Sequence, residues 1–369
     1  GDVSLGGTTP GGATISNGEI TLAWDETAAF NVTGTSDKLE LVNVTVDTDC
    51  DWLHEVVVRS TVTKSIYADF NESEKTRTAE LWLLADGTKI GTFTVTQNGR
   101  IDLSANETSN CYIVSGNGTY AFKATKGYGG ASVDGTFAGA SNKIANVRNS
   151  KIGDNVWVSF EISSWSECNE FISVTDGTNI LWRWHIWCTN AAEVGTTGIL
   201  DRNLGASSTA DAGYLYQWGR KDPFMFATEH KPSITTGGSY DNGVRNPNVF
   251  YSDWSAGSWA TNGKTVNDPC PAGHCIPKSD QLPPEGTTGV TSSGVTYNGV
   301  TYPLTDHVAN GTYKSKDAAN TGLYWTTTDK DNTKVQLLVH NDNNQKKVYN
   351  GQFGGNTSFG HAVRCVRVN

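Results

Sequence analysis

The sequence has few charged residues and lacks the long apolar runs of membrane-spanning helices. Charged residues make up 18% of the 369 residues, and no apolar stretch reaches the length that a bilayer requires. The formal net charge is −10, and an acidic surface repels phosphate backbones. We therefore expect no nucleic-acid partner and no membrane-spanning segment.

Catalytic and cofactor motifs are also missing. The seven cysteines form no CxxC pair, and the seven histidines are not spaced to complete a zinc site. No glycine-rich phosphate loop, HExxH motif or GxSxG elbow occurs. The sequence predicts no cofactor, no metal site and no enzymatic activity.

Glycine, with 40 residues, and tryptophan, with 12, are abundant. Alternation of apolar and polar residues is common, and long stretches with helical periodicity are scarce. A chain of this length favours two or three domains. We expect a mainly β protein with a minor α+β part, in which two immunoglobulin-like β-sandwiches precede a third domain.

The first sandwich is expected over residues 14–99, after a flexible glycine-rich tether over residues 1–13. Val42, Val44 and Val46 alternate with polar residues, and Ala79, Leu81 and Leu83 repeat the pattern. Asp86-Gly87 predicts a hairpin turn.

The second sandwich is expected over residues 100–192 and ends in a strand from Ile180 to Cys188. Period-two alternation places Trp182 and Trp184 on one face, which predicts that they fill the core rather than bind a sugar. Trp187 lies on the other face, where it is expected to pack against the following domain.

Residues 193–369 are expected to form the third domain, which contains a loop-rich stretch between Pro223 and Lys264. Recognition residues concentrate in loops that a rigid scaffold holds, and aromatic residues among Ser, Gly and Asn are typical of binding surfaces. The predicted ligand-binding residues are Tyr240, Tyr251, Trp254 and Trp259. The alternative is that Trp254 and Trp259 anchor the loop to its own domain.

Several motifs in the C-terminal half occur in a characteristic order. They are Asp201-Arg202-Asn203-Leu204-Gly205, Gly213 to Phe224, Asn267 to Pro277, Tyr324-Trp325-Thr326-Thr327 and Gly360 to Arg367. This half resembles the C-terminal domain of a family of Bacteroidetes cell-surface proteins, related to the Fibrobacter major paralogous domain. The resemblance implies a C-type-lectin-like fold over residues 193–369. The segments 47–53 and 93–99 resemble a BACON domain, which serves as a spacer or as a carbohydrate binder.

The resemblance implies that Cys270 and Cys365 are neighbours and form a disulfide; a Cys270–Cys275 bond is the alternative. Cys50 is the expected unpaired cysteine. The run from His340 to Asn344 could hold calcium, but a hairpin turn is favoured. The sugar-binding motifs of calcium-dependent lectins are missing.

The function that these resemblances imply is non-enzymatic adhesion or recognition at the cell surface. The expected partner is a glycan or a host or microbial surface protein, with pilin subunits as further partners if the chain is a fimbrial tip component. The expected location is the outer membrane, as an outward-facing lipoprotein. One alternative is a glycan-capture lipoprotein of a polysaccharide-utilisation system. A remote one is a formylglycine-generating type of enzyme.

Overall fold

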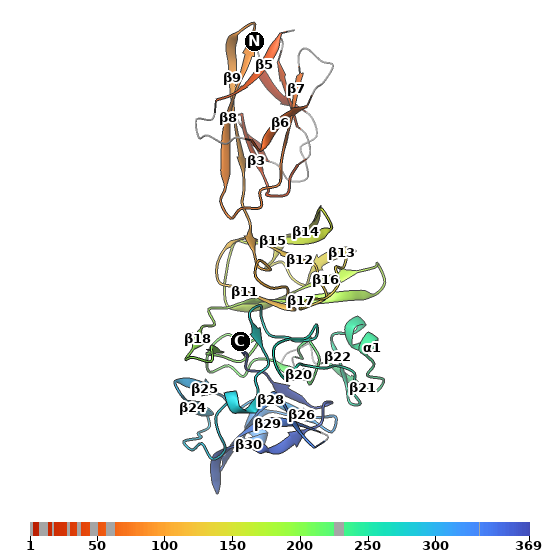
Figure 1. The fold of residues 1–369 in the computed structure, drawn as a ribbon, viewed down its shortest axis with the longest axis vertical. Coiled ribbons are helices and arrows are strands. Elements are labelled where there is room, and N and C mark those ends of the chain that lie inside the picture. Colours follow the sequence, from red (N-terminus) through yellow and green to blue (C-terminus); the bar gives the residue numbers. More distant parts are fainter. Residues whose placement is uncertain are drawn as a thin grey trace. The chain divides into compact units, whose positions relative to one another are not determined.

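The computed structural model shows a mainly β protein, as predicted. It describes residues 3–6, 14–16, 18–27, 30–34, 38–44, 51–56, 63–224, 232–331 and 333–369. Strands account for 49% of the described residues and helices for 4%. Two compact units divide the chain: residues 1–102 with 118–120, and residues 103–117 with 121–369 (Figure 1). Of the helices in the described ranges, none has the length and hydropathy for crossing a bilayer.

The first unit is a sandwich of two sheets, as expected for an immunoglobulin-like domain. One sheet has the order β1-β4-β7-β6, with β1 (Val3–Gly6), β4 (Phe30–Gly34), β7 (Thr63–Ala68) and β6 (Leu53–Val56). The other has the order β2-β3-β9-β8-β5, with β2 (Thr14–Ser16), β3 (Glu19–Leu22), β9 (Thr88–Gln97), β8 (Arg77–Ala85) and β5 (Leu39–Asn43). The predicted inward residues Ala79, Leu81 and Leu83 are buried in its core. A short strand, β10 (Ile101–Asp102), follows.

Two expectations for this unit need correction. Residues 3–6 are not a free tether, because β1 pairs antiparallel with β4, which satisfies its backbone hydrogen bonds. The alternation around Val42 predicts a half-buried strand with the valines on one face, yet Val42 is 37% exposed, because β5 turns its other face to the core. Val46, Cys50 and most of the remaining predicted tether lie outside the described residues.

The second unit begins with two facing sheets. One contains β12 (Gly118–Lys123), of which residues 121–123 belong to this unit, followed by β15 (Asn155–Ile162) and β14 (Ala145–Ile152). The other has the order β11-β17-β16-β13, with β11 (Cys111–Val114), β17 (Ile180–Cys188), β16 (Cys168–Thr175) and β13 (Thr136–Gly139). Trp182 and Trp184 are buried, as the alternation predicted. The indole of Trp184 packs against Phe122 and Phe137.

A larger sheet organises the rest of the second unit. Its order is β27-β26-β31-β28-β29-β30, with β27 (Thr312–Lys314), β26 (His307–Ala309), β31 (Gly360–Ala362), β28 (Thr321–Lys330), β29 (Thr333–Asp342) and β30 (Gln345–Gly355), and β20 (Leu215–Gln217) also pairs with β31. Small two-stranded sheets surround it: β18 (Glu193–Val194) with β19 (Ile199–Leu200), β21 (Ser233–Thr235) with β22 (Val249–Tyr251), β23 (His274–Cys275) with β32 (Val366–Arg367), and β24 (Val295–Tyr297) with β25 (Val300–Tyr302). The helices are α1 (Tyr240–Arg245), α2 (Lys316–Ala319) and the 3₁₀ turn η1 (Ser279–Gln281).

The segments expected as a second sandwich and as a separate C-terminal domain share one core. Trp187 of β17 is fully buried in a cluster that also holds Trp218, Trp325 and Val363. Its indole nitrogen donates to the carbonyl of Ala206 over 3.2 Å. This packing is why residues 103–117 and 121–369 form a single compact unit.

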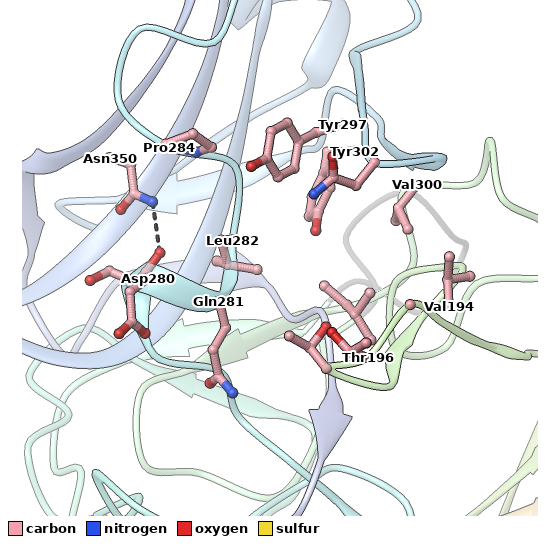
Figure 2. A pocket seen from close by; sticks show the side chains of 15 residues that line it. Val194, Thr196, Asp280, Gln281, Leu282, Pro284, Tyr297, Val300, Tyr302 and Asn350 are labelled. Atoms are coloured by element: carbon pink, nitrogen blue, oxygen red, sulfur yellow. Dashed lines mark hydrogen bonds between the residues drawn. The ribbon is translucent and has the colours of Figure 1, made fainter.

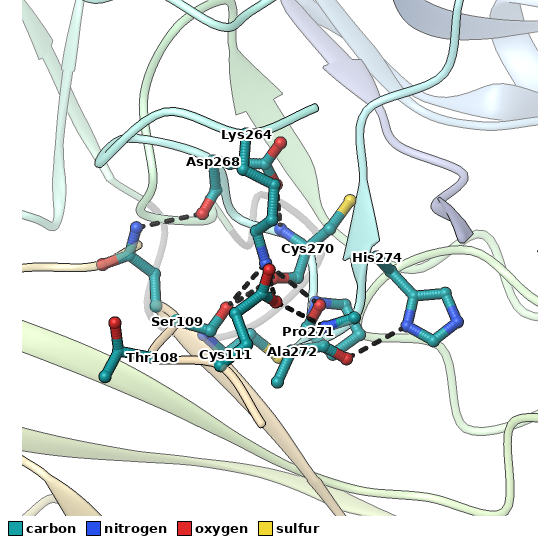
Figure 3. Close-up of polar contacts among 12 residues, drawn as sticks. Thr108, Ser109, Cys111, Lys264, Asp268, Cys270, Pro271, Ala272 and His274 are labelled. Carbon is teal, nitrogen blue, oxygen red and sulfur yellow. Dashed lines mark hydrogen bonds and ion pairs between the residues drawn. The ribbon is translucent and has the colours of Figure 1, made fainter. Parts of the chain in front are cut away.

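A buried lysine holds the same two segments together through polar contacts (Figure 3). The side chain of Lys264 is 1% exposed, and its Nζ lies 3.1 Å from Glu107 Oε2. The same nitrogen donates to Ser109 Oγ over 3.0 Å and to the carbonyls of Cys270 and Pro271. One ammonium thus joins the segment before β11 to the Asp268–Gly273 turn, and its charge is balanced by Glu107.

A buried arginine gathers three of the predicted motifs. The Arg364 guanidinium donates to Asn203 Oδ1 over 2.8 Å, to the Leu200 carbonyl over 3.2 Å and to the Thr301 carbonyl over 2.6 Å. Asn203 also donates to the Tyr324 hydroxyl over 3.2 Å. Next to Arg364, Cys365 forms the predicted disulfide with Cys270, with a Cα–Cα distance of 5.9 Å.

We predict that Arg364→Met destabilises the second unit by about 3 kcal/mol or more. The substitution leaves two buried and one partly buried oxygen acceptor without donors, and each buried one costs roughly 1–3 kcal/mol. The measurement is urea-induced unfolding of the variant and of the wild-type chain.

The matched control for this experiment is Arg367→Met. Arg367 lies three residues further on and forms an ion pair with Glu193 in which both side chains are well exposed. Its loss should change stability by about 1 kcal/mol at most. Equal effects of the two substitutions would show that Arg364 has no special role in this fold.

Candidate functional site

Three of the four predicted ligand-binding aromatics lie in the protein interior. Tyr251, Trp254 and Trp259 are 4%, 2% and 4% exposed. The Trp254 indole donates to the carbonyl of Trp218 over 2.9 Å, and the Trp259 indole to the carbonyl of Asn267 over 3.0 Å. The prediction of a shared ligand surface is therefore corrected: the three rings are buried and anchor the loop, and backbone carbonyls satisfy the two indole donors.

Tyr240 differs from the other three. It begins α1, its side chain is 38% exposed, and its hydroxyl donates to Asn267 Oδ1 over 3.1 Å. Tyr240 and Trp254 do line one small pocket together with Asn267, but its volume of about 10 Å³ is too small for a ligand.

A pocket of about 610 Å³ lies elsewhere in the second unit (Figure 2). This volume is typical of small-molecule binding sites. Its walls come from the loop between β18 and β19, the η1 segment, the β24–β25 hairpin and one residue of β30. The lining residues that the argument uses are Thr196, Asp280, Gln281, Tyr297, Tyr302 and Asn350.

A tight hairpin positions the two tyrosines of the pocket. Asn298 and Gly299 connect β24 to β25 with φ angles of 49° and 79°, the left-handed values that Asn-Gly turns supply. The register pairs Tyr297 with Val300 and Val295 with Tyr302. Directly paired residues share a face of a sheet, so both tyrosines lie on one face of the hairpin. Figure 2 shows their side chains close to each other in the wall of the pocket.

The two rings differ in their surroundings. Tyr302 is 2% exposed, and its ring packs edge-on against Tyr324 and under the Arg364 guanidinium, 4.6 Å away. Burial raises the pKa of the Tyr302 hydroxyl to about 12, so this group stays neutral. Tyr297 is only half-buried, so it is the tyrosine that can offer a ring face to a ligand.

The opposite part of the pocket is polar. After Pro277 the chain makes only the single turn η1, because Pro283 and Pro284 cannot continue a helix. Asn350 of β30 ties this turn to the sheet: its side-chain amide donates to the carbonyls of Ser279 and Pro283 over 2.8 Å and 2.9 Å. Thr196, Asp280 and Asn298 are exposed at the rim.

The pocket is better equipped for binding than for proton transfer. Among the described residues that line it, Asp280 supplies the one carboxylate, and no histidine, lysine or arginine takes part. General acid–base catalysis would need paired titratable groups there. Across the part of the chain that the structure describes, no group of three or more His, Cys, Asp or Glu side chains could hold a metal ion.

The other side chains that could take part in chemistry, mainly cysteines and histidines, are bonded or buried. Cys270 is bonded to Cys365, and burial raises the pKa of the Cys275 thiol to about 12, which disfavours the thiolate that cysteine chemistry requires. The run from His340 to Asn344 includes the turn between β29 and β30. Burial lowers the pKa values of His185 and His361 to about 3.

The pocket was not predicted from the sequence, although one signal for it was present. Thr296-Tyr297-Asn298-Gly299-Val300-Thr301 contains an Asn-Gly pair between alternating strands, a strong hairpin signal. A hairpin that presents two tyrosines on one face is a candidate wall for a site. The partners from η1 and β30 could not be found in this way, because contacts over some 70 residues leave no local pattern.

Comparisons with known proteins give no relative for this chain. No protein-family model and no curated protein matches it. Similar solved structures include a chimeric titin Z1Z2, with 8% identity, a TM-score of 0.20 and coverage of 50% of this chain and 95% of that one. An endo-fucoidan hydrolase, MfFcnA4 of glycoside hydrolase family 107, has 11% identity, a TM-score of 0.19 and coverage of 49% and 29%. Domains 4–9 of the surface layer protein SbsC have 15% identity, a TM-score of 0.18 and coverage of 51% and 32%.

We predict that His361 makes stability depend on pH between pH 7 and pH 5. Its pKa is about 3 in the folded chain and about 6.5 in the unfolded chain, so on acidification the unfolded chain binds a proton that the folded chain does not. The free energy of unfolding therefore falls with falling pH. The contribution of His361 from pH 7 to pH 5 is roughly 2 kcal/mol.

The measurement compares His361→Gln with the wild-type chain by urea unfolding at several pH values. The variant should lose less stability on acidification by roughly that amount, whatever its stability at pH 7. His340→Gln is the control, since His340 lies on the exposed hairpin of β29. Parallel pH profiles for His361→Gln and the wild-type chain would contradict the prediction.

Proposed function

We propose that the chain is a non-enzymatic recognition protein that binds a carbohydrate in the pocket between η1 and the β24–β25 hairpin. The observation that carries the proposal is the half-buried Tyr297 ring beside a polar rim with a single carboxylate, Asp280. The apolar face of a sugar packs on an aromatic ring, and its hydroxyl groups bond to amide, hydroxyl and carboxylate groups.

The scaffold around the pocket suits such a role. Tyr297 sits on a short hairpin, Tyr302 is fixed under Arg364, and Asn350 ties η1 to β30. These contacts fix the walls of the pocket before a ligand arrives. Such a site loses little conformational entropy on binding.

A cell-surface location is part of this proposal. The Cys270–Cys365 disulfide supports it, because disulfides persist in oxidising compartments outside the cytosol. The resemblance of residues 193–369 to C-type-lectin-like domains of surface proteins points the same way. The first unit would then hold the recognition unit away from the cell as a spacer.

We predict that a glycan array probed with the purified chain gives saturable binding that Tyr297→Ala weakens by about tenfold or more, equivalent to about 1.4 kcal/mol. Asp280→Asn should also weaken it, because a neutral amide accepts a weaker hydrogen bond than a carboxylate. EDTA should leave binding unchanged, since the lining residues offer a single carboxylate.

The control variant is Tyr128→Ala, which removes a tyrosine of 43% exposure that does not line the pocket. Thermal unfolding of each variant confirms that its fold is intact. A blank array would rule out carbohydrate as the ligand class among the glycans presented. Binding that survives both Tyr297→Ala and Asp280→Asn would place the glycan site elsewhere.

A further inference from the structure

Two cysteines lie directly opposite each other in neighbouring strands of the second unit. Cys168 is the first residue of β16, and Cys188 is the last residue of β17. The antiparallel register pairs these two residues. Both are free thiols in the structure, whereas Cys270 and Cys365 are already bonded.

The hydrogen bonds of β17 show whether Cys168 and Cys188 form a hydrogen-bonded or a non-hydrogen-bonded pair of the antiparallel ladder. The amide groups of His185 and Thr189 donate to β11, to the carbonyls of Asn110 and Val114. Backbone groups alternate in direction along a strand, so those of Cys188 point the other way, toward β16. Cys168 and Cys188 therefore form a hydrogen-bonded pair, with Cα atoms typically about 5.5 Å apart. Disulfides span about 4.4–6.8 Å between Cα atoms.

The two side chains meet on the same face of the sheet. Directly paired residues share a face, so the register brings the Cys168 and Cys188 side chains together on it. Cys188 is buried, with 2% exposure, and Cys168 is half-buried. An oxidant in solution can thus reach the Cys168 thiol. The buried Cys188 thiol can then react with Cys168 from within the sheet.

We propose that Cys168 and Cys188 form a second, readily reduced disulfide. The Cys168 thiolate attacks a small disulfide oxidant such as oxidised glutathione and releases one thiol of the oxidant. The Cys188 thiol then gives up its proton and displaces the second thiol from the mixed disulfide. In total, one S–S bond forms in the chain, one breaks in the oxidant, and two electrons and two protons pass to the oxidant.

The position of the pair indicates why this bond is easier to reduce than Cys270–Cys365. Directly opposite residues hold their Cβ atoms about 4.5–5.5 Å apart, with the longer values in hydrogen-bonded pairs, and a disulfide needs about 3.5–4.5 Å. The strands must draw together, and strain of this kind makes a disulfide more reducible. Cys270 and Cys365 are both fully buried, which also shields their bond from thiol reagents.

The Cys168–Cys188 bond would restrain the segment that leads from β17 to the C-terminal part of the second unit. Cys188 ends β17, directly after Trp187 in the shared core. The chain then runs to β18, whose Val194 lines the pocket. Oxidation would fix the start of this connection to β16.

The test is intact-protein and peptide mass spectrometry of the full chain after equilibration with oxidised and reduced glutathione. We expect a linked peptide pair containing Cys168 and Cys188, and three free thiols after denaturation, out of seven cysteines. Stepwise addition of reduced glutathione should open this bond before Cys270–Cys365. Five free thiols with only the Cys270–Cys365 pair, or a linkage of Cys168 or Cys188 to other cysteines, would overturn the proposal.

Variants provide a second measurement that does not depend on the mapping. Cys168→Ser, at the half-buried position, should raise the number of free thiols from three to four. The control, Cys275→Ser, removes a free thiol outside the pair and should lower the number from three to two. If the Cys168–Cys188 bond forms but opens only together with Cys270–Cys365, the lability that we infer from the register is wrong.

Discussion

The buried guanidinium of Arg364 is the constraint on which the C-terminal part of the second unit depends. It is fully buried and joins its own C-terminal tail to two other segments, one with Leu200 and Asn203 and one with Thr301. A buried cation of this kind is tolerated only when its donors are satisfied. The three segments must therefore come together before Arg364 can leave water, which couples the C-terminal tail to the β24–β25 hairpin.

This coupling explains how a small hairpin can form a defined pocket wall. The β24–β25 pair alone would be unstable in water, since isolated two-stranded hairpins are marginal. Arg364 binds the carbonyl of Thr301 and lies over the ring of Tyr302. The pocket geometry thus rests on contacts made behind it, in the core, and only Tyr297 and the rim residues are left to face a ligand.

A second buried cation, Lys264, joins the sandwich strands to the C-terminal segments. Its contacts to Glu107 and Ser109 on one side and to Cys270 on the other cross what the sequence suggested as a domain boundary. Trp187 adds an apolar contact across the same boundary. Composition alone could not show this, because a tryptophan at a boundary and a tryptophan in a core have the same local pattern.

The features that local patterns control were predictable, and those that depend on distant partners were not. Period-two alternation located β17 and its faces, and Asp86-Gly87 located a turn, because both follow from backbone geometry. The same argument misplaced Val42, since alternation does not say which face meets the core. The resemblance of the signature segments identified the Cys270–Cys365 pair.

The loop aromatics show most clearly why a binding site is harder to predict than a strand. Trp254 and Trp259 lie among Ser, Gly and Asn residues, a composition that exposed binding loops and well-anchored loops share. What separates the two cases is whether a buried carbonyl accepts the indole N–H, as those of Trp218 and Asn267 do here. That carbonyl belongs to the tertiary structure, so an aromatic residue becomes a candidate ligand contact only when the fold leaves its ring uncovered, as it does for Tyr297.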